Sequence, residues 1–285
     1  MNRKLKQLQK LLLIAICFGL VGCAGLGVKP EGPFVLSTDS VKIHYSDTGQ
    51  GEVALVFIHG WMCDSSYWQN QVDYFKSKYR VVTLDLAGHG QSGLERQDYS
   101  ISKFADDVIA VVNHLQLKKV ILVGHSMGGP VALEATTRLP DNIIGVVAVD
   151  SFATGFQWPE KQKIQEAVAP FKDNFKEQTY KLVTSMFPEN ADPALVNEIA
   201  SDMASGPKQV GISAFSHLLE WMANNNYQKI RKNLSVPFVH INALHKNMPI
   251  IRDKIVFVSD VGHFIPQEAP EKFNEALEQA IYLMK

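Results

Sequence analysis

Short apolar runs that alternate with helical patterns constrain the fold of this chain more than any other feature. The clearest runs are rich in Val, Ile and Leu and cover residues 53–58, 80–84, 119–123 and 143–149. Each has the length and composition of a strand that is buried on both faces. Apolar residues at helical spacing occur between them, most clearly from 101 to 115. The alternation predicts an α/β fold with a mainly parallel sheet and helices on both faces.

Further segments extend this pattern towards both ends of the chain. Four of them have strand character and bring the predicted sheet to eight strands: 34–37, 41–46, 236–241 and 255–258. Three others have helical character: 64–78, 126–138 and a last helix that opens at Pro270. Pro is favoured in the first turn of a helix, so Pro270 marks a helix start.

Residues 152–235 interrupt the alternation. They contain no good strand pattern, and several Pro residues separate their helical patterns. Large apolar residues are frequent in this segment, and most of them would form its own core: Phe156, Trp158, Phe171, Phe175, Met186, Phe187, Met203, Phe215, Trp221 and Met222. We interpret residues 152–235 as an α-helical cap, inserted between residues 34–151 and 236–285 of one core.

The first 22 residues differ in composition from the rest. Residues 1–10 are basic, and residues 11–22 are an apolar run of 12 residues that ends at Cys23. A transmembrane helix needs about 20 apolar residues, so the run is short and has the flanks of a signal peptide. Leu20-Val21-Gly22-Cys23 resembles the lipobox of bacterial lipoproteins, in which the Cys is lipidated and becomes the new N-terminus.

This resemblance implies a signal peptide at 1–22 and a lipidated N-terminus with a linker at 23–33. The protein would then be a membrane-anchored lipoprotein in the periplasm or at the cell surface, with the bilayer as a partner through Cys23. An uncleaved anchor, or a signal cut elsewhere, is the alternative. After cleavage, Lys+Arg would fall from 28 to 24 against 29 acidic residues, a formal charge of about −5. This charge gives no reason to expect a nucleic acid as partner.

Cysteine usage fits an exported chain without a disulfide. Cys17 would leave with the signal peptide and Cys23 would carry lipid, so Cys63 would remain alone. We expect Cys63 to be a small packed side chain and not a nucleophile.

The strand at 119–123 runs directly into Gly124-His125-Ser126-Met127-Gly128 and then into a helix. A tight strand-to-helix turn exposes the serine hydroxyl, and the two glycines let the backbones approach closely. The following helix directs its N-terminal N–H groups towards the same centre. In this context the G-x-S-x-G motif predicts a nucleophile elbow at Ser126.

Three further motifs appear in chain order with this one. They are His59-Gly60-Trp61, Asp85-Leu86-Ala87-Gly88-His89-Gly90-Gln91-Ser92, and Gly262-His263-Phe264 followed by Gln267-Glu268-Ala269-Pro270-Glu271. Together with the elbow, they make nearly all of the mature chain resemble the α/β-hydrolase fold.

The resemblance implies a role for each matching residue. Ser126 would attack a carbonyl carbon, and His263 would take its proton and return it to the leaving group. The backbone N–H groups of Trp61 and Met127 would form the oxyanion hole. No cofactor and no metal site is implied, and the other histidines lack the spacing of metal ligands.

The acid of the triad departs from the family's commonest pattern. Family members usually carry it just after the seventh strand, where residues 241–249 contain no carboxylate. A subset places it after the sixth strand, where Asp150 stands. Asp150 is therefore our prediction, against its alternative reading as a structural turn residue. Asp260 is a weaker candidate, and Asp253 adjoins the eighth strand and comes too late in the chain.

The other polar residues of the motifs are expected to be structural. His59 and His89 would hydrogen-bond backbone in their loops, and His125 and Asp85 would stabilise their turns.

Two classes of function remain open. The first is a serine hydrolase that cleaves a carboxylic ester of a mainly apolar small molecule through an acyl-enzyme. Other chemistries use the same triad, namely those of a C–C hydrolase, a thioesterase, a lactonase or a cofactor-free haloperoxidase. The second class is a catalytically inactive, membrane-anchored binding protein, which the missing carboxylate after the seventh strand would favour.

Overall fold

The computed structural model describes residues 33–152, 160–243 and 254–285. The predicted signal peptide and the lipidation site at Cys23 lie outside these residues, as do Phe156, Trp158 and Asp253.

One eight-stranded sheet forms the centre of the described chain, and its strands follow the order β1-β2-β4-β3-β5-β6-β7-β8. The strands are β1 (Phe34–Leu36), β2 (Lys42–Thr48), β3 (Val53–Ile58), β4 (Arg80–Leu84), β5 (Lys119–His125), β6 (Ile143–Val149), β7 (Phe238–Ala243) and β8 (Lys254–Val258). β1 pairs with β2 and β2 with β4 in antiparallel fashion, and all other pairs are parallel. The predicted eight-stranded, mainly parallel sheet is confirmed.

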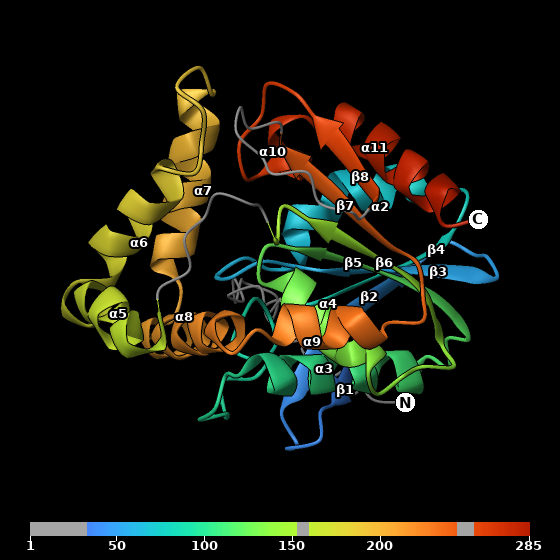
Figure 1. The fold of residues 1–285 in the computed structure, drawn as a ribbon, viewed down its shortest axis with the longest axis horizontal. Helices are drawn as coiled ribbons and strands as arrows, with labels where there is room; N and C mark the ends of the chain where they lie inside the picture. The colour runs from blue at the N-terminus through green and yellow to red at the C-terminus, as the bar shows by residue number, and fades with distance from the viewer. Residues whose placement is uncertain (1–32, 153–159, 244–253) are drawn as a thin grey trace, which may run out of the picture. The chain divides into compact units, whose positions relative to one another are not determined.

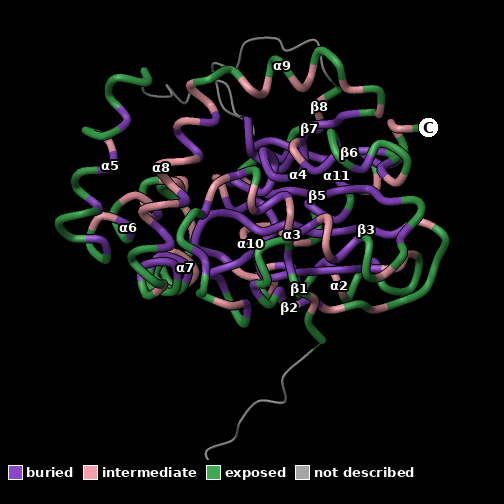
Figure 2. The backbone as a smooth tube through the Cα atoms, turned by 90° about the horizontal axis from the view of Figure 1, so that it is seen from below, coloured by how far each residue is buried: buried purple, intermediate pink, exposed green. Residues whose placement is uncertain are grey.

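Helices cover the sheet on both faces (Figure 1). On one side lie α3 (Ile101–His114) and α4 (Gly128–Thr136), and on the other lie α2 (Gln69–Phe75) and α11 (Pro270–Leu283). Figure 2 shows the central strands buried along most of their length, as continuous apolar runs require.

The bounds of β3, β4 and β6 coincide with the predicted runs. β7 begins at Phe238, later than expected, directly after Pro237, which has no N–H for a ladder hydrogen bond. The helix expected from 126 begins at Gly128, because Ser126 has a φ of 53° and is not helical.

The segment between β6 and β7 is mainly helical from residue 160 onwards. It contains the 3₁₀ helix η2 (Lys161–Lys163) and helices α5 (Ile164–Asp173), α6 (Phe175–Thr184), α7 (Pro193–Ser205), α8 (Lys208–Ala223) and α9 (Asn226–Asn233). Helices α5 to α8 stand beside the sheet in Figure 1, and α9 packs against α4. We call residues 160–233 the cap. Among the described residues, no helix has both the length and the apolar character that a membrane span requires.

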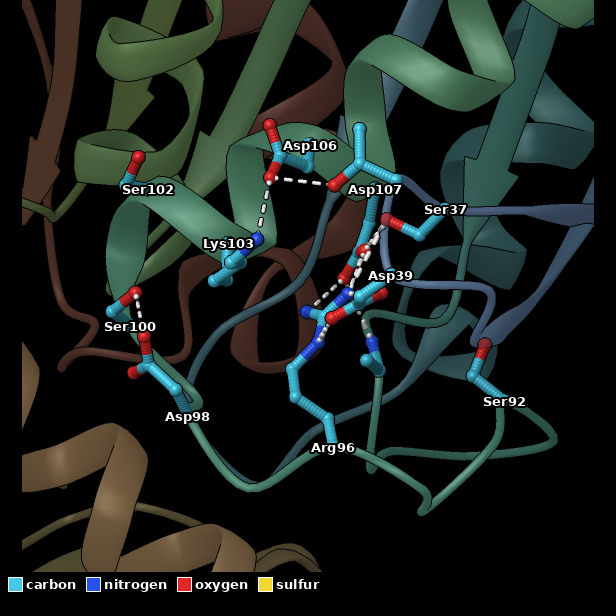
Figure 3. A network of polar contacts seen from close by, with 12 residues as sticks. Ser37, Asp39, Ser92, Arg96, Asp98, Ser100, Ser102, Lys103, Asp106 and Asp107 are labelled. Atoms are coloured by element: carbon cyan, nitrogen blue, oxygen red, sulfur yellow. Dashed lines mark hydrogen bonds and ion pairs between the residues drawn. The ribbon is translucent and has the colours of Figure 1, made fainter.

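A partly buried ion-pair network fastens the turn between β1 and β2 to the core (Figure 3). The Arg96 guanidinium donates hydrogen bonds to the carboxylates of Asp39 and Asp107, and the Ser37 hydroxyl donates to Asp107 at 2.6 Å. Arg96 and Asp107 are fully enclosed. Removing either partner would leave an uncompensated buried charge, so we assign this network to the stability of the fold.

A short helix completes the architecture near the end of the chain. Helix α10 (Ile265–Glu268) directly precedes α11 and follows the loop that carries His263.

Candidate active site

Ser126 occupies a strained turn between β5 and α4. Its φ is 53°, a left-handed conformation that is uncommon for a non-glycine residue, and its N–H donates to the Val149 carbonyl at 2.9 Å. A Cβ on Gly124 would collide with the Gly128 carbonyl, and one on Gly128 would collide with the Ile58 carbonyl. The two glycines therefore permit the close backbone approach that a nucleophile elbow needs.

The imidazole of His263 is hydrogen-bonded to the carboxylate of Asp150, with 2.7 Å between Nδ1 and Oδ2. Asp150 is buried, whereas the His263 side chain is 18% exposed. Because a carboxylate accepts, Nδ1 carries the proton and Nε2 is left as the basic nitrogen. This is the arrangement that a general base beside a serine requires.

Asp150 reaches His263 from the end of β6 because its own backbone is held by β7. Its φ is 44°, its N–H donates to the Ile241 carbonyl at 2.8 Å, and its Oδ1 accepts from the Ala243 N–H at 3.3 Å. The carboxylate thus lies at the carboxyl end of β7. The described residues do not bring Asp260 to His263. Its side chain is 76% exposed and faces Lys272.

The loop after β3 lies against the serine. A Cβ on Gly60 would stand 3.2 Å from the Ser126 Cβ, so the backbone that leads into Trp61 passes close to the nucleophile. Met127 immediately follows Ser126 and caps α4, where the N–H groups have no intrahelical acceptors. Both predicted oxyanion donors therefore border Ser126.

His125 packs beside His263, with ring centroids 4.8 Å apart. Its Nε2–H donates to the His263 carbonyl at 2.9 Å. Burial, reinforced by the neighbouring His263, lowers the pKa of His125 to about 3, so its ring is neutral at physiological pH. It supports the loop that carries His263.

Glu268 holds the same loop from the other side, and the sequence interpretation missed it. Its two carboxylate oxygens accept from the N–H groups of Gly262 and Phe264, at 2.9 and 3.0 Å. These amides flank His263. Burial raises the pKa of Glu268 although both hydrogen bonds oppose the shift. Glu268 belongs to the motif that follows His263, but the motif alone does not indicate which groups its carboxylate contacts.

The cap also contacts this loop. The His263 N–H donates to the Met186 carbonyl at 3.0 Å, in the connection between α6 and α7. The Phe187 ring stacks on Phe264 with centroids 4.9 Å apart.

The two other motif histidines hydrogen-bond to backbone groups of the loops that follow β3 and β4. His59 donates from Nδ1 to the Gly60 carbonyl and accepts the Leu86 N–H at Nε2, and burial lowers its pKa. His89 donates from Nδ1 to the Ala87 carbonyl, and burial lowers its pKa to about 3.

Asp85 and Cys63 are buried as well. Burial alone would raise the pKa of Asp85, but the hydrogen bonds from the Ser65 and Gln91 N–H groups, with the nearby His59, outweigh it and lower the pKa. Burial raises the pKa of the Cys63 thiol, which keeps it protonated and unreactive. Within the described ranges, no group of three or more His, Cys, Asp or Glu side chains is arranged to hold a metal ion.

Comparison with known proteins identifies the family of this chain. The family model described as alpha/beta hydrolase fold matches residues 53–283. 3-Oxoadipate enol-lactonase 2 of Acinetobacter baylyi is 24% identical over a 259-residue alignment that covers 85% of this chain and 94% of that protein.

Solved structures share the fold. A thermophilic esterase from Thermogutta terrifontis superposes with a TM-score of 0.75 at 22% identity, over 88% of this chain and 98% of its own. Est816, described as an N-acyl homoserine lactone degrading enzyme, superposes with a TM-score of 0.72 at 26% identity, over 87% and 99%.

Proposed function

The chain belongs to the alpha/beta hydrolase fold family, and from this membership we propose that it is a serine hydrolase that cleaves a carboxylic ester through an acyl-enzyme. The observation that carries the proposal is the Asp150–His263 hydrogen bond at 2.7 Å, together with Ser126 in a left-handed turn after β5 and its neighbour His125 packed 4.8 Å from the His263 ring, centroid to centroid. The carboxylate of Asp150 also weakens the case for an inactive binding protein, which rested on the missing acid after β7.

The reaction follows from the protonation of His263. Its free Nε2 takes the proton of the Ser126 hydroxyl as Oγ attacks the carbonyl carbon, and the backbone N–H groups of Trp61 and Met127 receive the oxyanion. Collapse of the tetrahedral intermediate breaks the ester C–O bond, and Nε2 returns the proton to the leaving alcohol. Water then attacks the acyl-enzyme by the same steps and releases the acid.

The side chains near the oxyanion loop favour a mainly apolar substrate. The Trp61 ring lies 5.3 Å from that of Phe215 and 6.0 Å from that of Phe171, centroid to centroid. The relatives named as esterase, enol-lactonase and N-acyl homoserine lactone degrading enzyme act on open or cyclic esters by their names. A cyclic ester would pass through the same steps, so we include lactones among the candidate substrates.

A fluorophosphonate probe tests the proposal. The detergent-solubilised full chain should acquire one adduct on Ser126, located by mass spectrometry, and should hydrolyse p-nitrophenyl esters from acetate to decanoate. Ser126→Ala should abolish both signals, and Ser66→Ala, at an exposed serine, should affect neither. An unlabelled Ser126 together with no ester hydrolysis would exclude the serine hydrolase.

We further propose that the enzyme is a lipoprotein anchored at Cys23, in the periplasm or on the cell surface. The support is the sequence alone, with its basic segment, its short apolar run and the Leu20–Cys23 pattern. A stably held anchor needs more than one acyl chain, as lipoproteins carry. Cys23→Ala should abolish incorporation of an alkyne-labelled fatty acid, whereas Cys17→Ala should not. Continued labelling of Cys23→Ala would refute the anchor.

A further inference from the structure

We infer that the cap positions the oxyanion hole, and that the indole of Trp61 is the connecting group. Trp61 thus has two separate parts in the proposed reaction. Its backbone N–H receives the oxyanion, and its side chain fixes where that N–H stands. The inference rests on the proposed function, since it assigns a positioning role within the same site.

The indole is bound to the cap and not to its own loop. Its Nε1–H donates to the Gly211 carbonyl of α8 at 2.8 Å, across 150 positions of sequence. Phe171 and Phe175 meet the Trp61 ring edge-on, at interplanar angles of 85° and 74°. Trp61 is 5% exposed. The side chain is therefore held on several sides by cap residues.

The next residue extends this contact. Met62 has a φ of 55°, a left-handed conformation that is unfavourable for a non-glycine residue and persists only where the surroundings impose it. A Cβ on Gly206 would collide with the Met62 Cε, and one on Gly211 would lie 2.9 Å from the Met62 Sδ. The cap glycines thus leave the space that Met62 fills.

The loop itself is too short to absorb a displacement of its side chains. The Cys63 N–H donates to the Gly60 carbonyl at 3.2 Å and closes a tight turn around Trp61 and Met62. A movement of α8 would therefore shift the Trp61 N–H relative to Ser126. A misplacement of about 1 Å can lower a rate by roughly 10², and one oxyanion donor is worth about 10²–10³ in kcat.

Trp61→Phe removes the indole N–H but keeps an aromatic ring and the backbone donor. We expect kcat for p-nitrophenyl butyrate to fall about 10- to 100-fold, with KM changed less than about threefold, because the loss falls on the transition state. The Ki of a trifluoromethyl ketone, whose adduct places its oxygen in the oxyanion hole, should rise by the same factor.

The matched control is Trp221→Phe. Trp221 lies on α8, as Gly211 does, and is as buried as Trp61, with 6% exposed. Its indole donates to Glu134 of α4 at 2.7 Å and not to the oxyanion loop. The substitution removes one hydrogen bond between α8 and α4 but leaves the Trp61–Gly211 hydrogen bond and the rings around Trp61 in place, so kcat and Ki should stay within about twofold of wild type. If both Trp variants lost activity equally, general loosening of the cap would explain the loss and the inference would be wrong.

A second variant covers the case in which Trp61→Phe does not fold. Gly211→Ala keeps Trp61 but places a Cβ against Phe175 and Met62, while Ala favours the α8 helix. It should lower kcat and raise the ketone Ki in parallel. Wild-type kcat and Ki in either folded variant would overturn the inference and leave the hydrolase proposal intact. A wild-type chain inert to esters and to fluorophosphonate would overturn both.

Discussion

Replacing Asp150 by Asn tests the proposed catalytic group that the sequence assigned least directly. The two carboxylate oxygens accept hydrogen bonds from different donors. Oδ2 accepts from His263 Nδ1 at 2.7 Å, and Oδ1 accepts from the Ala243 N–H at 3.3 Å. Asn has one acceptor oxygen and one NH₂ group in their place, so it can satisfy only one of the two donors.

The expected loss depends on which donor the amide oxygen serves. If it serves Ala243, the NH₂ group faces His263 and selects the tautomer with a proton on Nε2, which cannot act as base and lowers kcat by about 10⁴. If it serves His263, the tautomer is kept, but the negative charge that stabilises the imidazolium is lost. A charge-assisted hydrogen bond is worth about 1.5–3 kcal/mol, which corresponds to about 10- to 150-fold. We therefore expect kcat to fall between about 10- and 10⁴-fold.

The assay is the steady-state release of p-nitrophenol from the butyrate ester at pH 8, with urea unfolding to verify that the variant is folded. Asp260→Asn is the control, because Asp260 is three residues from His263 but exposed. It should retain activity within about twofold. A folded Asp150→Asn variant with more than a third of wild-type kcat, or a large loss in Asp260→Asn, would contradict the assignment of Asp150.

Three further predictions follow from the buried groups around the site. Glu268→Gln should lower kcat about tenfold with little change in KM, because one of the two amides beside His263 loses its acceptor. The control Glu275→Gln, on the exposed side of α11, should be neutral, and an equal effect of both variants would contradict the role of Glu268 in holding the His263 loop. Burial lowers the pKa of His89 to about 3, below the usual histidine value of about 6.5, so the unfolded chain is protonated first and folding stability falls as pH drops below about 6.5. His89→Asn should reduce this slope by up to about 1.4 kcal/mol per pH unit, measured by urea unfolding between pH 7 and 4.5, and an unchanged slope would show that His89 titrates normally. Gly124→Ala should abolish fluorophosphonate labelling or soluble expression, since its Cβ meets backbone that cannot yield, and normal labelling would show that the turn is looser than described.

The sheet could be read from the sequence because each central strand is buried on both faces. Such a strand needs apolar residues at successive positions, and this produces a continuous run that ends where the strand ends. The bounds of β3, β4 and β6 were therefore predicted to the residue. β5 (Lys119–His125) continues two residues beyond its predicted run at 119–123, because its last residues, Gly124 and His125, are buried without being large apolar residues.

The contacts that position the site could not be read in the same way. The Trp61–Gly211 and His263–Met186 hydrogen bonds each end on a backbone carbonyl. Every residue has a backbone carbonyl, so the sequence does not indicate which carbonyl accepts the hydrogen bond. Glu268 was visible as a residue of a motif, but its role needs the local path of the chain, which brings both amides beside His263 within reach of one carboxylate.

The position of Asp150 shows why a motif search at one strand end can miss an acid that another strand provides. Parallel pairing places Val149 of β6 opposite Ile241 of β7, so Asp150, which follows β6, emerges beside the last residues of β7 at the same edge. The left-handed turn at Asp150 then directs its carboxylate across this edge to the Ala243 N–H and to His263. What the base requires is a carboxylate oxygen at Nδ1, and the register of the two strands lets either strand end supply it. The chemistry therefore constrains where the carboxylate lies in space and leaves open which strand carries it.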